Sequence, residues 1–265
     1  MSAIAASRGF PMKQSMRFLF ALIVVACATA ARASDLEDTC AASSSYDLVV
    51  GADALVFERG APVPRRIEWR DGRLRVDGAG VTLNTEDADR LALFARELRA
   101  LVPKVKAIAL RGLDLATGVV RDETRRLATS ADTRAELDRR IGEHAAELRR
   151  RIALSNGTRD WQADAFERDV AAWSADLAPL LAADVGRGAV TAALDGDLDA
   201  AVALQARASE LGNGLQPKIE RRLRELRPQI ETLCPAIRRL HELQDGVRDG
   251  NGRALDLLEI GAARR

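Results

Sequence analysis

The sequence predicts an α+β fold that is predominantly α, with a small N-terminal antiparallel β meander followed by several long helices packed as a bundle. Three observations predict it. Short alternating segments separated by Gly-containing turns occupy residues 47–83. Beyond residue 84, apolar residues recur every three or four positions, as on the buried side of a helix. Aromatic residues make up only 4% of the chain, so the core depends on Leu, Val, Ile and Ala, a composition that favours helix.

Residues 1–33 have the parts of a secretory signal peptide. Lys13 and Arg17 give a positively charged start, and an apolar stretch too short to span a bilayer follows. Small residues then predict cleavage between Ala33 and Ser34. We therefore expect a mature chain that resides in the periplasm, with no membrane span after cleavage.

Two features of this segment are left open. Translation can begin at any of three methionines: Met1, Met12 or Met16. Cys27 follows Val24-Val-Ala26, which loosely matches the sequence before a lipidated cysteine. Lipidation at Cys27 would anchor the protein to a membrane without changing its fold, and this is the alternative to a soluble periplasmic protein.

The cysteines agree with export. Removal of Cys27 with the signal peptide leaves two, Cys40 and Cys234, an even number in an oxidising compartment. We predict a disulfide between them; two buried free thiols are the alternative. Two isolated cysteines and two isolated histidines have no metal-ligand spacing, so the sequence predicts no metal site and no cofactor.

The charge balance narrows the range of partners. The whole chain has a formal charge of +1, and the mature chain keeps 36 basic and 39 acidic residues, a net charge of −3. A nearly neutral, finely mixed chain lacks the basic face of a nucleic-acid-binding protein. The partner is expected to be a periplasmic protein or envelope component, and the sequence leaves its identity and the oligomeric state open.

Residues 34–83 are predicted to form an extended segment and the meander. Asp71-Gly72 lies between two alternating segments, which is a strong hairpin signal. Ile67 and Trp69 should share the buried face, with the neighbouring arginines on the solvated face.

The helical domain is predicted over residues 84–248. Its first helix is capped by Asn84 or Thr85, is broken or kinked at Pro103, and continues to about Leu127. A turn and cap at Ser130 precede a highly charged helix with a narrow apolar stripe. Asn156-Gly157 should end that helix.

The second half of the helical domain contains most of the chain breakers. A helix that starts near Trp161 carries several aromatics and is expected to be central. An Ala- and Gly-rich stretch over residues 185–211 follows, and Gly212-Asn-Gly214 should break the chain. The last helical region should start near Gln216 and be bent or split by two prolines, Pro228 and Pro235. Residues 249–265 are expected to form a flexible tail.

Candidate catalytic residues are few. His144 lies at the edge of an apolar stripe and is the best single candidate for a base, although a boundary histidine is the favoured interpretation; Glu143 and Glu147 share part of its helix face. His241 is expected to be solvated. The chain has neither a Gly-x-Ser-x-Gly elbow nor a P-loop, and Gly186-Arg-Gly188 is too short for dinucleotide binding.

The alternating acids of Asp195-Gly-Asp-Leu-Asp199 faintly resemble a calcium loop. This segment lacks the glycine and the glutamate that such a loop requires, so it predicts a turn and helix cap. Asn156-Gly-Thr158 is a glycosylation sequon, but the bacterial-type export signal makes a glycan improbable.

One set of motifs resembles a known family. Its members are Cys40, Asp47-Leu-Val-Val50, Asp71-Gly-Arg-Leu-Arg-Val76, Val81-Thr-Leu-Asn84, Leu98-Arg-Ala-Leu-Val-Pro-Lys-Val105 and Cys234. In this order they are similar to the YggN-like family of Proteobacteria, periplasmic proteins that carry a domain of unknown function. The resemblance implies the periplasmic location and the layout of meander and helices. It implies no catalytic residue.

Three functions are compatible with these observations. The first is a soluble, non-enzymatic periplasmic protein that acts in interaction or envelope maintenance, because chemical motifs are missing and mixed-charge helix faces are large. The second is a carrier of an apolar or amphipathic ligand between helices, for which residues 185–211 would move. The third is an enzyme that uses scattered carboxylates with His144 as base.

Overall fold

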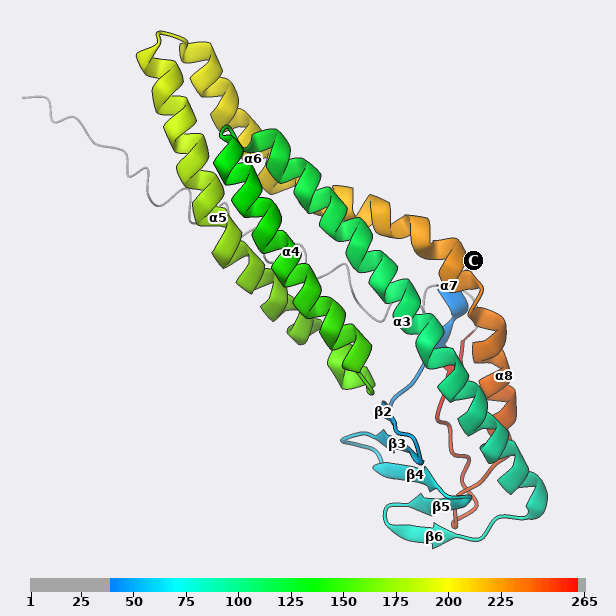
Figure 1. Cartoon of the computed structure of the whole chain (residues 1–265). Helices are drawn as coiled ribbons and strands as arrows, with labels where there is room; N and C mark the ends of the chain where they lie inside the picture. Colours follow the sequence, from blue (N-terminus) through cyan, green and yellow to red (C-terminus); the bar gives the residue numbers. More distant parts are fainter. Residues whose placement is uncertain (1–38, 262–265) are drawn as a thin grey trace, which may run out of the picture.

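The structure, a computed structural model, describes residues 39–261 apart from the side chains of residues 163–167 and 212. The predicted signal peptide, its cleavage site after Ala33, and Cys27 lie outside the described residues. The fold is α+β and predominantly α, as predicted. A small sheet forms one end of an elongated molecule, and long helices extend away from it (Figure 1).

Five antiparallel strands form the sheet in the order β2-β3-β4-β5-β6, so every neighbour in sequence is a neighbour in space. The strands are β2 (Asp47–Val50), β3 (Ala54–Glu58), β4 (Arg66–Arg70), β5 (Arg73–Val76) and β6 (Ala79–Val81). The turn at Asp71-Gly72 has positive φ at both residues, as a two-residue hairpin requires. Its register pairs Trp69 with Leu74, which confirms the predicted hairpin.

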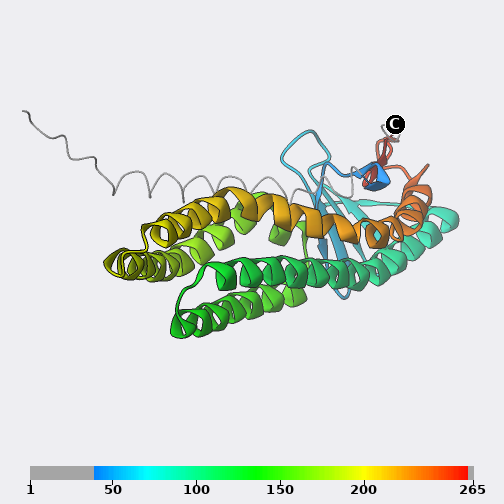
Figure 2. The ribbon, with the colours of Figure 1, turned by 90° about the horizontal axis from the view of Figure 1, so that it is seen from above.

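Helices, four of which have 24 residues or more, make up most of the remaining chain. They are α3 (Thr85–Leu127), α4 (Ala131–Leu154), α5 (Ala163–Leu194), α6 (Leu198–Leu223), α7 (Arg227–Glu231) and α8 (Cys234–Gln244), with the 3-10 turns η1 (Thr158–Trp161) and η2 (Arg224–Leu226). Helices α3, α4, α5 and α6 lie side by side as a bundle, and α3 continues past them to cover the sheet together with α8 (Figures 1 and 2).

The core has two parts. At the sheet end, side chains of the inner sheet face, such as Leu55 and Ile67, pack with α3 residues such as Phe94 and α8 residues such as Leu240. In the bundle, a smaller cluster joins the turn between α3 and α4 to α4 and α5. Its buried members are Leu127, Ala128, Leu137, Ile141, Leu177 and Leu181.

The chain ends are fastened to the sheet end. Cys40 and Cys234 form the predicted disulfide, which joins the start of the described chain to the first residue of α8. Strands β1 (Ala42–Ser43) and β7 (Glu259–Ile260) pair antiparallel next to it. The expectation of a flexible tail from residue 249 is wrong for residues 249–261, because Leu255 and Leu257 are buried in the core.

Two predicted helix breaks are wrong. Of the break or kink expected at Pro103, the break is wrong and the kink stays a prediction: α3 is continuous there, since its two halves pack on α8, α4 and α6, and these contacts outweigh one lost backbone hydrogen bond. Helix α6 runs through Gly212-Asn-Gly214, and no new helix starts near Gln216, because α6 packs on both α3 and α5. The split predicted from Pro228 and Pro235 is present as η2, α7 and α8.

The central helix is also not the predicted one. Trp161 lies in η1 and is 39% exposed, and α5 is an outer member of the bundle. The aromatic residues near α5 suggested a core position, but α3 is the helix that contacts α4, α5, α6 and α8. Helix α3 can contact all four of these helices because its 43 residues reach from the sheet to the far turn of the bundle.

Candidate functional site

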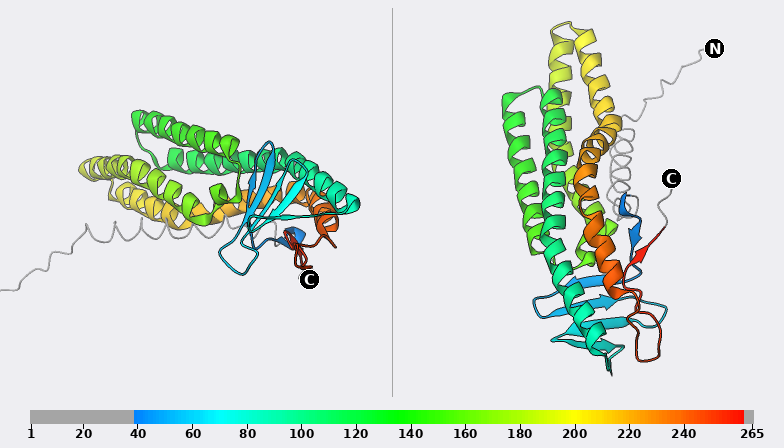
Figure 3. Two further views of the ribbon diagram at one scale, coloured as in Figure 1. Left: turned by 90° about the horizontal axis from the view of Figure 1, so that it is seen from below. Right: turned by 90° about the vertical axis from the view of Figure 1, so that its right-hand side faces the viewer.

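The α5–α6 hairpin extends beyond the rest of the bundle. Asp184 in α5 contacts the turn between α3 and α4, and α5 continues for ten further residues to Leu194 before it turns into α6. All views show this hairpin end projecting past the α3–α4 turn (Figures 1 and 3). We call residues 188–206 the distal end.

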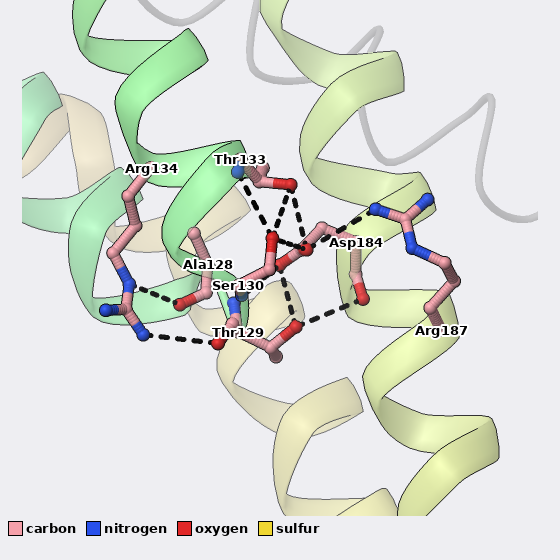
Figure 4. Close-up of polar contacts among 7 residues, drawn as sticks. All are labelled: Ala128, Thr129, Ser130, Thr133, Arg134, Asp184 and Arg187. Carbon is pink, nitrogen blue, oxygen red and sulfur yellow. Dashed lines mark hydrogen bonds and ion pairs between the residues drawn. The ribbon is translucent and has the colours of Figure 1, made fainter.

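Asp184 anchors the base of this projection. Its side chain is 1% exposed and accepts hydrogen bonds from the hydroxyls of Thr129 at 2.8 Å, Ser130 at 2.7 Å and Thr133 at 2.9 Å (Figure 4). The backbone N–H groups of Thr129 and Ser130 also donate to it. Burial raises the pKa of Asp184, but the hydrogen bonds from Ser130, Thr129 and Thr133 outweigh it, and the pKa lies well below its usual range.

The Asp184 carboxylate lies at the N-terminus of α4. Ser130 is the N-cap of α4, and its hydroxyl accepts from the backbone N–H of Thr133 at 3.1 Å. A carboxylate at a helix N-terminus is stabilised by the free N–H groups and the helix dipole. Asp184 is therefore a second cap, supplied by another helix, that fixes α5 on the α3–α4 turn.

The surroundings of Asp184 fit the same role. Arg134 donates to the backbone carbonyls of Ala128 at 3.1 Å and Thr129 at 3.2 Å, which holds the turn in shape (Figure 4). Gly188 lies so close to Thr129 that a Cβ would be 2.8 Å from its methyl carbon. The hydrogen-bond acceptors of Asp184 are all engaged, so we assign it to positioning rather than to chemistry.

The distal end is apolar and exposed. Four large hydrophobic side chains are 60–81% exposed: Val190 (60%), Leu194 (81%), Leu198 (65%) and Val202 (67%). No residue from Gly188 to Ala206 is fully buried. Isolated exposed hydrophobic residues are ordinary, but four on a short projection are a feature of interaction surfaces.

The acids of the distal end are a second property of this surface. Asp197 caps α6, and its side chain accepts from the N–H of Ala200 at 2.9 Å. The turn and cap predicted for Asp195-Gly-Asp-Leu-Asp199 is thereby confirmed. Within residues 188–206 the sequence has three aspartates and no Lys or Arg.

Helix α5 differs in composition from its neighbour α4. Among the described residues, one stretch, Arg168–Leu194 in α5, is long and apolar enough to cross a membrane by length and composition alone. Of the 18 most apolar consecutive residues in this stretch, 11% are buried inside the protein. The same helix carries Asp176 and Asp184, which bond to α4 and to the α3–α4 turn. By contrast, α4 carries ion pairs along its exposed side, such as Arg139 with Glu136 and Glu143.

His144 belongs to a polar seam between α4 and α5. Its Nε2 lies 3.0 Å from a carboxylate oxygen of Asp176, and its ring stacks on Trp173 with centroids 5.3 Å apart. Arg140 bridges Asp176 and Glu136. Burial raises the pKa of Asp176, but hydrogen bonds from His144 and Arg140 outweigh it, and the net direction is downward.

The remaining predicted candidates are dispersed. Glu143 pairs with Arg139, and Glu147 pairs with Arg150, so neither joins His144 and Asp176. His241 is half-buried rather than solvated, because its Nδ1 lies 2.9 Å from the carbonyl oxygen of Leu258 in the ordered C-terminal segment.

Two clefts lie at the sheet end of the molecule. The larger, of about 660 Å³, is lined by residues 80–84 and the loop after α8, and the smaller lies beside the first turns of α3. Neither is lined by residues of the 185–211 stretch that the carrier hypothesis invoked. Among the side chains that the structure describes, no three from His, Cys, Asp or Glu are grouped so that they could hold a metal ion.

Sequence reasoning missed the two main features of the distal end. Asp184 accepts a hydrogen bond from Ser130, the predicted cap of α4. The two residues are 54 positions apart in sequence, and a contact at that separation leaves no local sequence pattern. The exposed apolar surface had a detectable signal, namely a stretch of 19 residues, 188–206, without a basic side chain.

No curated protein and no solved structure matches this chain. A family described as a protein of unknown function (DUF2884) matches residues 40–251, which include the sheet, the bundle and both disulfide cysteines. The match covers most of the sequence and every element from β2 to α8. The chain therefore belongs to the DUF2884 family.

Proposed function

We propose that this protein is exported to the periplasm and acts there as a non-enzymatic interaction protein that docks a partner through its distal end. The signal-like residues 1–33 support export, and so does the disulfide, because such bonds persist in oxidising compartments. As part of this proposal we assign the protein to the YggN-like periplasmic proteins of Proteobacteria, on the basis of the motifs between Cys40 and Cys234. Lipidation at Cys27 is the alternative mode of localisation.

The non-enzymatic assignment rests on how the polar groups are used. The carboxylate of Asp184 accepts hydrogen bonds from the residues that cap α4, and His144 lies between Asp176 and the ring of Trp173. The Ser130 hydroxyl that donates to Asp184 is itself the N-cap of α4, and His144 contacts Asp176 and Trp173, so both side chains are engaged in holding helices together. Helix α5 bonds to the α4 side through Asp176 and Asp184, so we assign it to the bundle and not to a membrane span.

The exposed apolar distal end is the single observation that carries the docking function. Water-exposed Leu194 and Leu198 contribute nothing to the core of this chain, and their burial against a partner would be favourable. The Asp184 anchor holds the projection in place, and a rigid base lowers the entropy cost of docking.

Photo-crosslinking in cells tests this function. A photoreactive residue at Leu198 should give one reproducible adduct mass, because the distal end is in contact with its partner. The matched control is Leu154, which is 82% exposed and lies at the other end of α4 from the α3–α4 turn. An absence of adduct at Leu198, or the same adduct from both positions, would contradict docking through the distal end.

Native mass spectrometry of the purified protein tests the location and processing. A chain that starts at Ser34 and is two hydrogens lighter than its reduced form would support export with a cleaved signal and a disulfide. A mass that includes a lipid on Cys27 would support the anchored alternative. A chain that retains residues 1–33 with free thiols would contradict export.

A further inference from the structure

We propose that the partner segment recognised by the distal end is a cationic amphipathic helix of another protein, whose apolar face is flanked by Lys and Arg. This inference rests on the proposed docking function and adds the chemistry of the partner. It is carried by three properties of the distal end: the spacing of its hydrophobic residues, its unbalanced charge, and the anchoring of its base.

The spacing of the hydrophobic residues fits a helix. Val190 and Leu194 are four residues apart on α5, and Leu198 and Val202 are four apart on α6. Residues at this spacing lie one above the other on a helix and form a ridge. Such ridges pack into the grooves between the side chains of a second helix. At 1.5 Å per residue, each arm of the distal end is roughly 10–13 Å long, which matches about two turns of a partner helix.

The charge of the distal end selects a basic partner. Asp195 and Asp197 lie in the turn between Leu194 and Leu198, Asp199 lies in the first turn of α6, and none of the three forms an ion pair with another described residue. The nearest basic side chains in sequence are Arg187 and Arg207, just outside the segment. A Lys or Arg beside the apolar face of the partner would find carboxylates that have no basic partner among the described residues, and electrostatic complementarity of this kind gives specificity and a fast association rate.

The same charge disfavours two other occupants. An anionic membrane surface would repel three carboxylates placed at the leading tip of the hairpin. A second copy docked tip to tip would oppose three aspartates with three more, and like charges across an interface are destabilising. Both remain outcomes that the experiment below would detect.

A pair of fluorescent peptides tests the chemistry. One is a 14-residue amphipathic helix of Leu and Lys, and the other has Glu in place of every Lys. Fluorescence anisotropy with the purified, disulfide-intact protein should show binding of the Leu/Lys peptide, weakened by added salt because ion pairs are screened. Binding of the Leu/Glu peptide with equal affinity, or no binding of the Leu/Lys peptide, would overturn the assignment of a cationic partner.

Matched variants locate the binding. Leu194→Ser with Leu198→Ser, and separately Asp195→Asn with Asp199→Asn, should each weaken the Leu/Lys peptide about tenfold, as expected for residues at the centre of an interface. Asp197 is left intact because it caps α6. The control, Glu143→Gln with Glu147→Gln, makes the same charge change on the exposed side of α4 and should weaken binding less than about twofold. Equal loss in the control would overturn the location, and circular dichroism checks that every variant is folded.

Two further measurements address the rival occupants. Co-sedimentation with phosphatidylglycerol-containing vesicles that is lost in the Leu194/Leu198 variant would overturn the proposal in favour of a lipid surface. Concentration-dependent dimerisation that the same variant abolishes would overturn it in favour of a second copy. If crosslinking at Leu198 yields a partner while the Leu/Lys peptide fails to bind, docking stands and only the cationic chemistry is lost.

Discussion

The two ends of the molecule differ in how far their apolar residues are buried. At the sheet end, residues from the sheet, α3, α8 and the C-terminal segment share one core, and the Cys40–Cys234 disulfide fastens the start of the described chain to α8. At the distal end, α5 and α6 project past the α3–α4 turn, and no residue between Gly188 and Ala206 is fully buried (Figure 1). The apolar residues of one end stabilise this chain, whereas those of the other are available to a different molecule. Under the proposed docking function, stability and interaction would be assigned to opposite ends of the long axis (Figure 1).

The disulfide gives the largest expected effect at the sheet end. Cys40→Ser with Cys234→Ser removes a link between residues 194 apart in sequence, and the free energy of unfolding should fall by ~3–5 kcal/mol because the unfolded chain regains the entropy of an open loop. Urea unfolding measures the change. Reductant should lower the wild-type protein to the same value and leave the double variant unchanged. A loss below ~1 kcal/mol would show that the link is not what holds this end together.

Truncation of the sheet core should be the next largest effect. Leu55 has no exposed surface, so Leu55→Ala removes buried methyl groups and leaves a cavity, and the free energy of unfolding should fall by ~3 kcal/mol. Leu154→Ala is the matched control, because Leu154 is 82% exposed, and it should change stability by less than ~0.5 kcal/mol. Equal losses in the two variants would break the distinction between core and surface leucines.

The Asp184 anchor should have a smaller but measurable effect. Asp184→Asn keeps the shape of the side chain but replaces an acceptor oxygen by a donor opposite the hydroxyl and N–H donors of residues 129–133. The free energy of unfolding should fall by ~2 kcal/mol, the range for hydrogen bonds to a charged group. Asp199→Asn, which lacks such partners, is the control and should be nearly neutral.

The pH dependence of this anchor follows from the lowered pKa of Asp184. A carboxyl group whose pKa is lower in the folded protein than in the unfolded chain stabilises the fold above the unfolded value, about 3.9. That contribution is lost as the pH falls below this value through the folded pKa. Unfolding measured at pH 7 and at pH 3 should therefore show a smaller acid-induced loss for Asp184→Asn than for the wild type. Identical losses would mean that Asp184 is not the group that titrates.

Local patterns predicted the parts of this molecule that local chemistry decides. The hairpin at Asp71-Gly72 needs only its two turn residues and flanking alternation, and the cap at Ser130 needs only a nearby backbone N–H. The helix breaks expected at Pro103 and Gly212 failed because packing against neighbouring helices compensates for a local defect, and such neighbours are invisible in a single sequence. For the same reason, the capping of α4 by Asp184 could not be predicted.

The apolar distal end should give the smallest effect on stability. Leu194→Ser with Leu198→Ser changes two of the most exposed leucines of the described chain, and removal of side chains already in water leaves no cavity, so the free energy of unfolding should shift by less than ~0.5 kcal/mol. Amide hydrogen exchange should report the same difference as fast exchange over residues 188–206 and slow exchange over the buried part of α3 around Phe94. A stability loss of ~2 kcal/mol would place these leucines in the core and remove the argument for docking, whereas an unchanged fold that no longer crosslinks a partner would assign both leucines to recognition.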